Sequence, residues 1–172
     1  CLQQTHFYST LDLLQASGWD VEKFGGAEGD DSLENLITFM SHVTPCYANS
    51  GDALKFVSVL MELLEREAAS LPAPLRRCMC QALILMRSKK GVALVATERM
   101  LKLFFRLFAL KDKHLRSLLY EAIVADIRKA NHPHRNNALN KTLQNFMYSI
   151  FTSSAAALNA STCTLDEMTA TK

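Results

Sequence analysis

The chain has 172 residues, of which 49% are apolar, and a formal net charge of +2. This length suits a single domain with a substantial core, and the composition excludes an intrinsically disordered chain. No apolar run is long enough to span a membrane, and no signal-peptide pattern opens the sequence. The chain begins with Cys1 rather than Met and stops within a stretch rich in Ser, Thr and Ala, so we expect a piece of a longer protein.

The near-neutral total conceals a division of charge along the chain. Residues 1–70 hold 11 acids against 3 bases, whereas residues 71–141 hold 15 bases against 4 acids. No acid occurs between Asp126 and Asp166. A basic half indicates a polyanionic partner on one side of the molecule. The alternative is an even scatter of solvated lysines and arginines.

The first predicted element is a weak amphipathic helix over residues 2–16, with apolar positions at Leu2, Leu11, Leu13 and Leu14. Residues 17–31 follow as a loop with four glycines and several acids. Such a composition has little to bury, so we expect this loop to be mobile and dispensable for folding. We assign residues 1–31 to an N-terminal segment that consists of this weak helix and the Gly-rich acidic loop.

Apolar residues at helical spacing predict three hairpins within residues 32–153. The first contains Phe39 on its leading helix and Leu54 on its second helix, both placed on the apolar side. Residues 154–172 are small or polar and read as a connector into a truncated further repeat. The predicted hairpins span residues 32–69, 72–110 and 112–153.

The hairpins begin near residues 32, 72 and 112, which is a period of 40. The match is direct in sequence, because LRRCMCQALI at residue 75 aligns with LRSLLYEAIV at residue 115. Two helices per unit at this period predict an all-α fold, a HEAT- or armadillo-like α-solenoid of stacked hairpins. A compact helical bundle is the alternative.

A basic, amide-rich turn joins the two helices of the third hairpin. Asn131 favours the conformation that ends a helix, and Pro133 cannot continue one. Asn136 or Asn137 can cap the next helix by accepting from its free backbone amides. The apolar side of that next helix is predicted at Leu139, Leu143, Phe146, Met147 and Ile150.

The sequence offers no catalytic set. It contains no Gly-rich phosphate loop, HExxH or CxxC motif, and no motif pairs a cysteine with a histidine. Five cysteines without regular spacing suggest reduced, metal-free thiols. Zinc binding by Cys78 and Cys80 with His132 and His134 is a weaker reading, because structural zinc sites show paired spacing. We therefore expect no enzyme activity, cofactor or metal.

The basic residues supply a better candidate site. Cations hold phosphates, and amides hydrogen-bond sugars and bases, so the turn region reads as an RNA-binding surface. An ordinary solvated helix face with capping asparagines explains the same composition about equally well. The predicted RNA-binding residues are Arg128, Lys129, His134, Arg135, Asn136, Asn137, Asn140, Lys141 and Gln144. A secondary basic surface is predicted from Arg87, Lys89, Lys90, Arg99, Lys102 and Arg106.

Several segments of the chain resemble a known family. They are FMSHVTPCY at 39–47, ALILMRSK at 82–89, LFFRLF at 103–108, KHLRSLLYEAIVADI at 113–127 and LNKTLQNFMY at 139–148. These are similar to the eukaryotic Severe-Depolymerization-of-Actin family, over about residues 33–151. The string LQNFMY after a basic Asn-Asn turn is the specific part. The family tends to carry more lysine in that turn, where Pro133 and Ala138 stand here.

The resemblance implies a non-catalytic helical-repeat protein of the nucleolus and nucleus. Members of the family act in maturation and nuclear export of the large ribosomal subunit precursor, and their name reflects a link to actin organisation. We therefore expect a ribosome biogenesis factor whose partners are pre-ribosomal RNA, ribosomal proteins and other assembly factors, with no membrane or small-molecule substrate. The alternative is a protein-only HEAT-repeat adaptor in protein transport or actin organisation.

Overall fold

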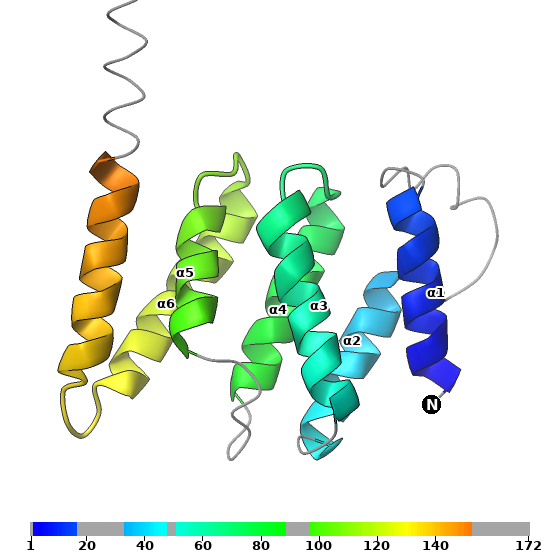
Figure 1. The fold of residues 1–172 in the computed structure, drawn as a ribbon, viewed down its shortest axis with the longest axis horizontal. Helices are drawn as coiled ribbons and strands as arrows, with labels where there is room; N and C mark the ends of the chain where they lie inside the picture. The colour runs from blue at the N-terminus through cyan, green and yellow to red at the C-terminus, as the bar shows by residue number, and fades with distance from the viewer. Residues whose placement is uncertain (1, 17–32, 48–50, 89–96, 153–172) are drawn as a thin grey trace, which may run out of the picture. The chain divides into compact units, whose positions relative to one another are not determined.

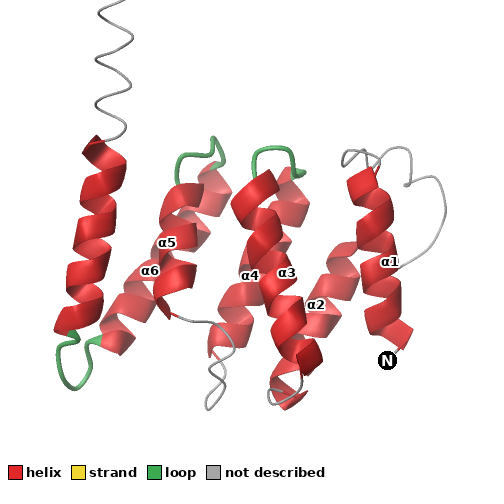
Figure 2. Cartoon of the chain, in the orientation of Figure 1, coloured by secondary structure: helices red, strands yellow, loops and turns green. Residues whose placement is uncertain are grey.

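The structure is a computed structural model that describes residues 2–16, 33–47, 51–88 and 97–152. Every regular element in these four segments is a helix (Figure 2), which confirms the all-α prediction for them. None of the described helices has the length and apolar character needed to cross a membrane. The chain divides into two compact units, residues 1–127 and residues 128–172.

The helices follow the predicted repeat. Three of them, α2, α4 and α6, begin at Leu33, Ala73 and Lys113, so that each starts 40 residues after the one before. A further helix covers residues 137–152. The labelled helices are α1 (Leu2–Ala16), α2 (Leu33–Val43), the 3-10 helix η1 (Thr44–Tyr47), α3 (Gly51–Glu67), α4 (Ala73–Ser88), α5 (Thr97–Leu107) and α6 (Lys113–Ala130).

The helices of the first unit lie in two layers. In Figure 1, α1, α3 and α5 form the layer nearer the viewer, and α2, α4 and α6 lie behind them. Helix α1 contacts α2, α2 packs on α4, and α3 packs on both α4 and α5. Because no hairpin buries its apolar face alone, stacking of successive hairpins builds the core, as in an α-solenoid.

The core of the first unit lies between these layers. Phe56 of α3, Leu83 of α4 and Phe104 of α5 are fully buried. Helix α1 adds Phe7, whose ring meets that of Phe56 edge-on with centroids 5.2 Å apart. The predicted apolar side of this helix is wrong at Leu2, which is 90% exposed. The other predicted positions, Leu11, Leu13 and Leu14, lie outside the described side chains.

Two further predicted core residues face outward. Phe39 of α2 is 47% exposed, and Leu54 of α3 is 51% exposed. Phe39 lies two positions after buried Ile37, and Leu54 lies two positions before buried Phe56. At roughly 100° per residue, a separation of two puts a side chain on the opposite side of its helix. The prediction that Phe39 and Leu54 lie on the apolar sides of their helices, which rested on their hydrophobicity alone, is therefore wrong.

Two ion pairs join α4 to the α6 region. Arg76 lies 3.7 Å from Asp112, and Arg87 lies 3.5 Å from Asp126. Asp112 also caps α6, because its Oδ1 accepts a hydrogen bond from the backbone N–H of Leu115 at 3.0 Å. This bond, together with the charges of Arg77 and Arg76, lowers the pKa of the Asp112 carboxyl.

The segments assigned to the chain's ends are only partly described. Helix α1 covers residues 2–16 of the predicted N-terminal segment, whereas the loop at 17–31 and the connector at 154–172 lie outside the described residues. The grouping into hairpins at 32–69, 72–110 and 112–153 stays a prediction.

Candidate nucleic-acid interface

Asparagines hold the turn of the second unit in place. The side chains of Asn131 and Asn140 exchange two hydrogen bonds, with Nδ2 of each donating to Oδ1 of the other at 3.1 and 2.8 Å. Oδ1 of Asn131 also accepts from the backbone N–H of Asn136 at 3.0 Å. This network ties the end of α6 to the first turn of the next helix.

Asn136 caps the helix that follows. Its Oδ1 accepts a hydrogen bond from the backbone N–H of Leu139 at 3.0 Å, which confirms one of the two predicted caps. The other candidate, Asn137, is exposed. Within the turn, the peptide bond between His132 and Pro133 is cis.

These contacts show that two of the predicted RNA-binding amides have a structural role. Asn136 caps a helix, and Asn140 is bonded to Asn131. No sequence pattern predicted the Asn131–Asn140 pair, because the two amides meet across an irregular turn rather than along one helix face. Asn137 and Gln144 are exposed, as is Asn136, whereas Asn140 is half-buried.

The basic residues of the turn face solvent. Residues 128–152 contain no acid, and no ion pair is formed within this part of the second unit. Its positive charge is therefore not neutralised by a carboxylate of the same segment. The exposed residues are Arg128, Lys129, His134, Arg135 and Lys141.

The secondary basic surface, in the first unit, differs from the turn because several of its basic residues form ion pairs with carboxylates. Nε and Nη2 of Arg99 each donate to the Glu65 carboxylate at 3.2 Å, and these bonds raise the pKa of Arg99. Lys102 donates to Glu98 at 2.6 Å, one helical turn away. Arg106 lines the same hollow as these pairs.

Arg87, at the end of α4, also has acidic and polar partners. It pairs with Asp126 and bonds the hydroxyl of Thr97 at the start of α5. Lys89 and Lys90 lie outside the described residues. Three of the six residues predicted for this surface thus form ion pairs with carboxylates, which reduces the positive charge available to phosphates.

The helix over 137–152 buries less than its sequence predicts. Of the five predicted apolar positions, Leu143 is buried and 4% exposed, whereas Met147 is 37% exposed. Leu139, Phe146 and Ile150 are half-buried. Tyr148 of the same helix is 72% exposed.

The described cysteines are free thiols in three environments. Cys46 is exposed, Cys78 is half-buried and Cys80 is buried. Burial raises the pKa of Cys80 to about 12 and raises that of Cys78 as well. The described side chains include no group of three or more His, Cys, Asp or Glu residues that could hold a metal ion.

Comparison with known proteins supports the family resemblance. The family model described as "SDA1, HEAT repeat" matches residues 39–168. The SDA1 homologue of Dictyostelium discoideum is 38% identical over 149 residues, which are 87% of this chain and 18% of that protein.

Two animal relatives agree. The SDA1 homologue of Nematostella vectensis is 36% identical over 91% of this chain and 22% of its own length. The homologue of Drosophila melanogaster is 35% identical over 87% of this chain and 19% of its own length. The chain therefore spans about a fifth of the length of these relatives.

Proposed function

Because the chain belongs to the SDA1 HEAT-repeat family, we propose that it is a non-catalytic segment of a ribosome biogenesis factor. In this role the exposed basic turn of the second unit docks on pre-ribosomal RNA. The remaining solenoid surface contacts ribosomal proteins and other assembly factors. The proposed setting is the nucleolus and nucleus, during maturation and export of the large ribosomal subunit precursor.

One observation carries the RNA-binding part of the proposal. Arg128, Lys129, Arg135 and Lys141 are exposed in a segment without acids, whereas Arg99 and Lys102 are paired with carboxylates. Binding of a cation to a phosphate releases condensed counterions, and this release drives association. A cation already bound to a carboxylate gains less from a phosphate, because the existing pair must first break.

The rigidity of the turn adds support. The Asn131–Asn140 pair and the Asn136 cap fix the backbone around Arg135 and Lys141. A fixed backbone lowers the ordering cost when neighbouring side chains bind a ligand.

The test compares two variants that each lose two positive charges. Arg135→Gln with Lys141→Gln removes exposed cations, and the control, Arg99→Gln with Lys102→Gln, removes paired ones. Binding to a fragment of precursor ribosomal RNA is followed by fluorescence anisotropy over a range of salt concentrations. The slope of log affinity against log salt should fall by about 1 to 2 units in the first variant, since each phosphate contact contributes roughly 0.7 to 0.9.

The control should keep most of the wild-type slope. Equal slopes in all three proteins, or a larger change in the control, would assign RNA contact to another surface or to none. The same substitutions in the full-length factor should reduce its co-sedimentation with the large-subunit precursor. A protein-only adaptor would show no RNA affinity in any of these forms.

A further inference from the structure

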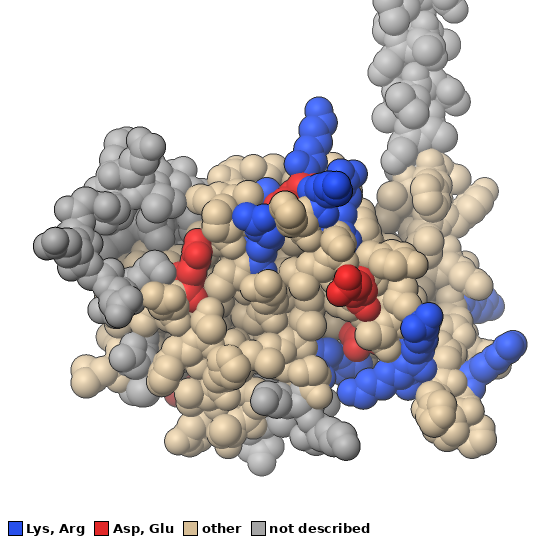
Figure 3. Space-filling view, turned by 180° about the vertical axis from the view of Figure 1, so that it is seen from behind, with Lys and Arg blue, Asp and Glu red and all other residues tan. Residues whose placement is uncertain are grey.

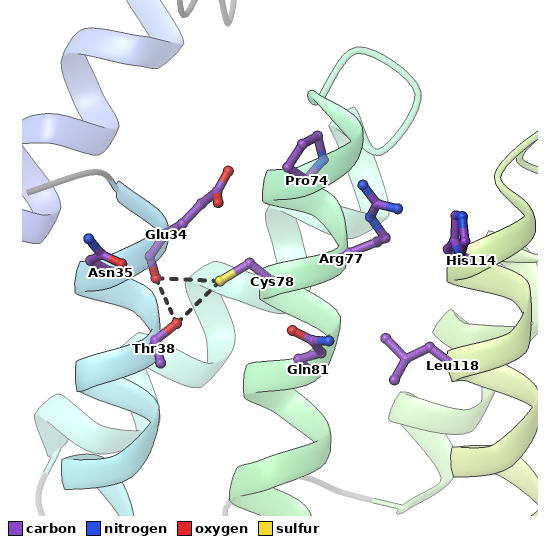
Figure 4. Close-up of a pocket in the computed structure, with 9 residues that line it drawn as sticks. All are labelled: Glu34, Asn35, Thr38, Pro74, Arg77, Cys78, Gln81, His114 and Leu118. Atoms are coloured by element: carbon purple, nitrogen blue, oxygen red, sulfur yellow. Dashed lines mark hydrogen bonds between the residues drawn. The ribbon is translucent and has the colours of Figure 1, made fainter. Parts of the chain in front are cut away.

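A polar groove crosses the layer of α2, α4 and α6 in the first unit. It has a volume of about 530 Å³. Figure 4 shows side chains from all three helices around it, with Glu34 and Thr38 of α2 at one end and His114 and Leu118 of α6 at the other. This groove lies outside the candidate RNA-binding surface, which belongs to the second unit.

The groove is built from equivalent positions of successive repeats. Glu34, Pro74 and His114 are 40 residues apart, as are Thr38, Cys78 and Leu118. The period that spaces the helices therefore brings one face of each to the same groove. The 40-residue spacing of these positions is visible in the sequence. The residue types at equivalent positions differ, however, so no cluster of like charges marks the groove.

Hydrogen bonds within the groove hold its α2 side together. The Cys78 thiol donates to the backbone carbonyl of Glu34 at 3.4 Å and lies 3.6 Å from the hydroxyl of Thr38. On the other side, the ion pair between Arg76 and Asp112 ties α4 to the start of α6. Because these contacts hold the three helices together, the side chains that line the groove keep their distances from one another.

Charge is distributed unequally along the groove. Arg77 is half-buried at the α4–α6 side and forms no hydrogen bond or close ion pair within the described residues. Its charge acts on the Asp112 carboxyl from a distance, whereas Arg76 contacts that carboxyl at 3.7 Å. Figure 3, which turns the α2–α4–α6 layer toward the viewer, shows basic side chains gathered along the upper edge around a small acidic patch. The α2 end carries the carboxylate of Glu34.

The remaining lining suits a peptide rather than a nucleic acid. Among the residues that the structure describes, no aromatic ring lines the groove, so they offer no platform on which a base could stack. The carboxylate of Glu34 also repels phosphates. The exposed amide of Gln81 can donate to and accept from a peptide group, and Leu118 provides an apolar contact.

We propose that this groove binds an extended acidic peptide segment of a partner protein, with one of its carboxylates held between Arg77 and His114. Neighbouring packed helices lie roughly 8–10 Å apart, so crossing from α2 to α6 takes about five or six extended residues. The acidic side chains lie toward the α4–α6 side of the groove, where the positive charge of Arg77 complements them. The end over α2 meets Glu34 and carries no acid.

The probe is a fluorescein-labelled octapeptide in which Asp alternates with Ser and one central residue is Leu. The control is an amide peptide of the same sequence in which Asn replaces every Asp. The 172-residue chain should bind the acidic peptide at least roughly tenfold more tightly than the amide peptide. Arg77→Gln should remove most of this difference, because a charge-assisted hydrogen bond is lost. Gln81→Ala should weaken both peptides about equally, by roughly threefold.

The double variant Arg135→Gln with Lys141→Gln is the control, since it lowers the net charge without touching the groove. It should bind the acidic peptide as the wild type does, while its RNA affinity falls. This crossed design separates failure of the groove from failure of the RNA surface. Circular dichroism of Arg77→Gln should match the wild type.

Several results would overturn the proposal. They are equal affinity for the two peptides, no binding of the acidic peptide at millimolar concentration, and unchanged binding by Arg77→Gln. Loss of RNA binding in Arg77→Gln would make the groove part of a nucleic-acid surface. Self-association that Arg77→Gln abolishes would assign the groove to a second copy of the chain.

Discussion

Asp112 Oδ2 lies 3.7 Å from Nη2 of Arg76, an ionic contact longer than a hydrogen bond. The two side chains are 8% and 10% exposed, respectively. Nη1 of Arg76 donates to the backbone carbonyl of Ala68 at 2.5 Å, just after α3. Arg76, on α4 in the second predicted hairpin, therefore links the end of α3 in the first hairpin to the cap of α6 in the third.

This relationship predicts a pH-dependent stability. The pKa of Asp112 is lowered in the folded protein, so its carboxylate contributes stability above about pH 4 that is lost as the pH falls through the folded pKa. Asp112→Asn keeps an oxygen that can cap α6 but removes the charge. In urea unfolding it should be less stable than the wild type at neutral pH, and this difference should shrink below about pH 4.

Asp12→Asn is the matched control, because Asp12 is exposed on α1. It should change the stability less than Asp112→Asn does at neutral pH. A wild-type advantage over Asp112→Asn that stays constant down to acid pH would show that the charge of Asp112 contributes nothing.

Two phenylalanines should differ in their contribution to the core. Phe104 is fully buried in α5, so Phe104→Ala should destabilise the first unit by about 3–5 kcal/mol. Phe146 is only half-buried, so Phe146→Ala should cost roughly half as much. Chemical unfolding followed by circular dichroism measures both. Equal costs would mean that Phe146 is covered by a part of the protein outside the described residues.

The turn network predicts a difference between adjacent asparagines. Asn136→Ala removes the cap of the helix over 137–152 and should lower its stability by about 1 kcal/mol. Asn137→Ala, at the exposed neighbour, should be nearly neutral. The hydrogen-exchange rate of the Leu139 backbone amide measures the cap directly, because this N–H donates to Asn136. Similar exchange in the two variants would count against Asn136 as the cap.

The thiols should react with alkylating reagent in the order of their exposure. Cys46 is exposed, whereas Cys80 is buried with a pKa of about 12, so the native protein holds almost no Cys80 thiolate at pH 8. Peptide mapping after a short reaction with iodoacetamide should find Cys46 labelled, Cys80 unlabelled and Cys78 intermediate. The three sites should react equally in denaturant. Early labelling of Cys80 would show that α4 opens readily.

The sequence by itself determined the features that depend on local rules. The starts of α2, α4 and α6 follow a period of 40, because each helix repeats the same apolar spacing. The Asn136 cap follows from the preference of a short oxygen-bearing side chain for a helix start. The family resemblance likewise rested on contiguous strings such as LQNFMY, and the match over residues 39–168 confirms it.

Only the tertiary structure decided which side chains those helices bring together. The sequence predicts that Arg99 and Arg135 both lie on basic surfaces. In the structure Arg99 forms an ion pair with Glu65 of another helix, whereas the segment around Arg135 contains no acid. Similarly, Arg76 and Arg77 are adjacent, but Arg76 is buried beside Asp112, whereas Arg77 lines the groove. The partners come from residues more than thirty positions away, so no local pattern carries them. Charge and burial at these positions are therefore properties of the stacked repeats.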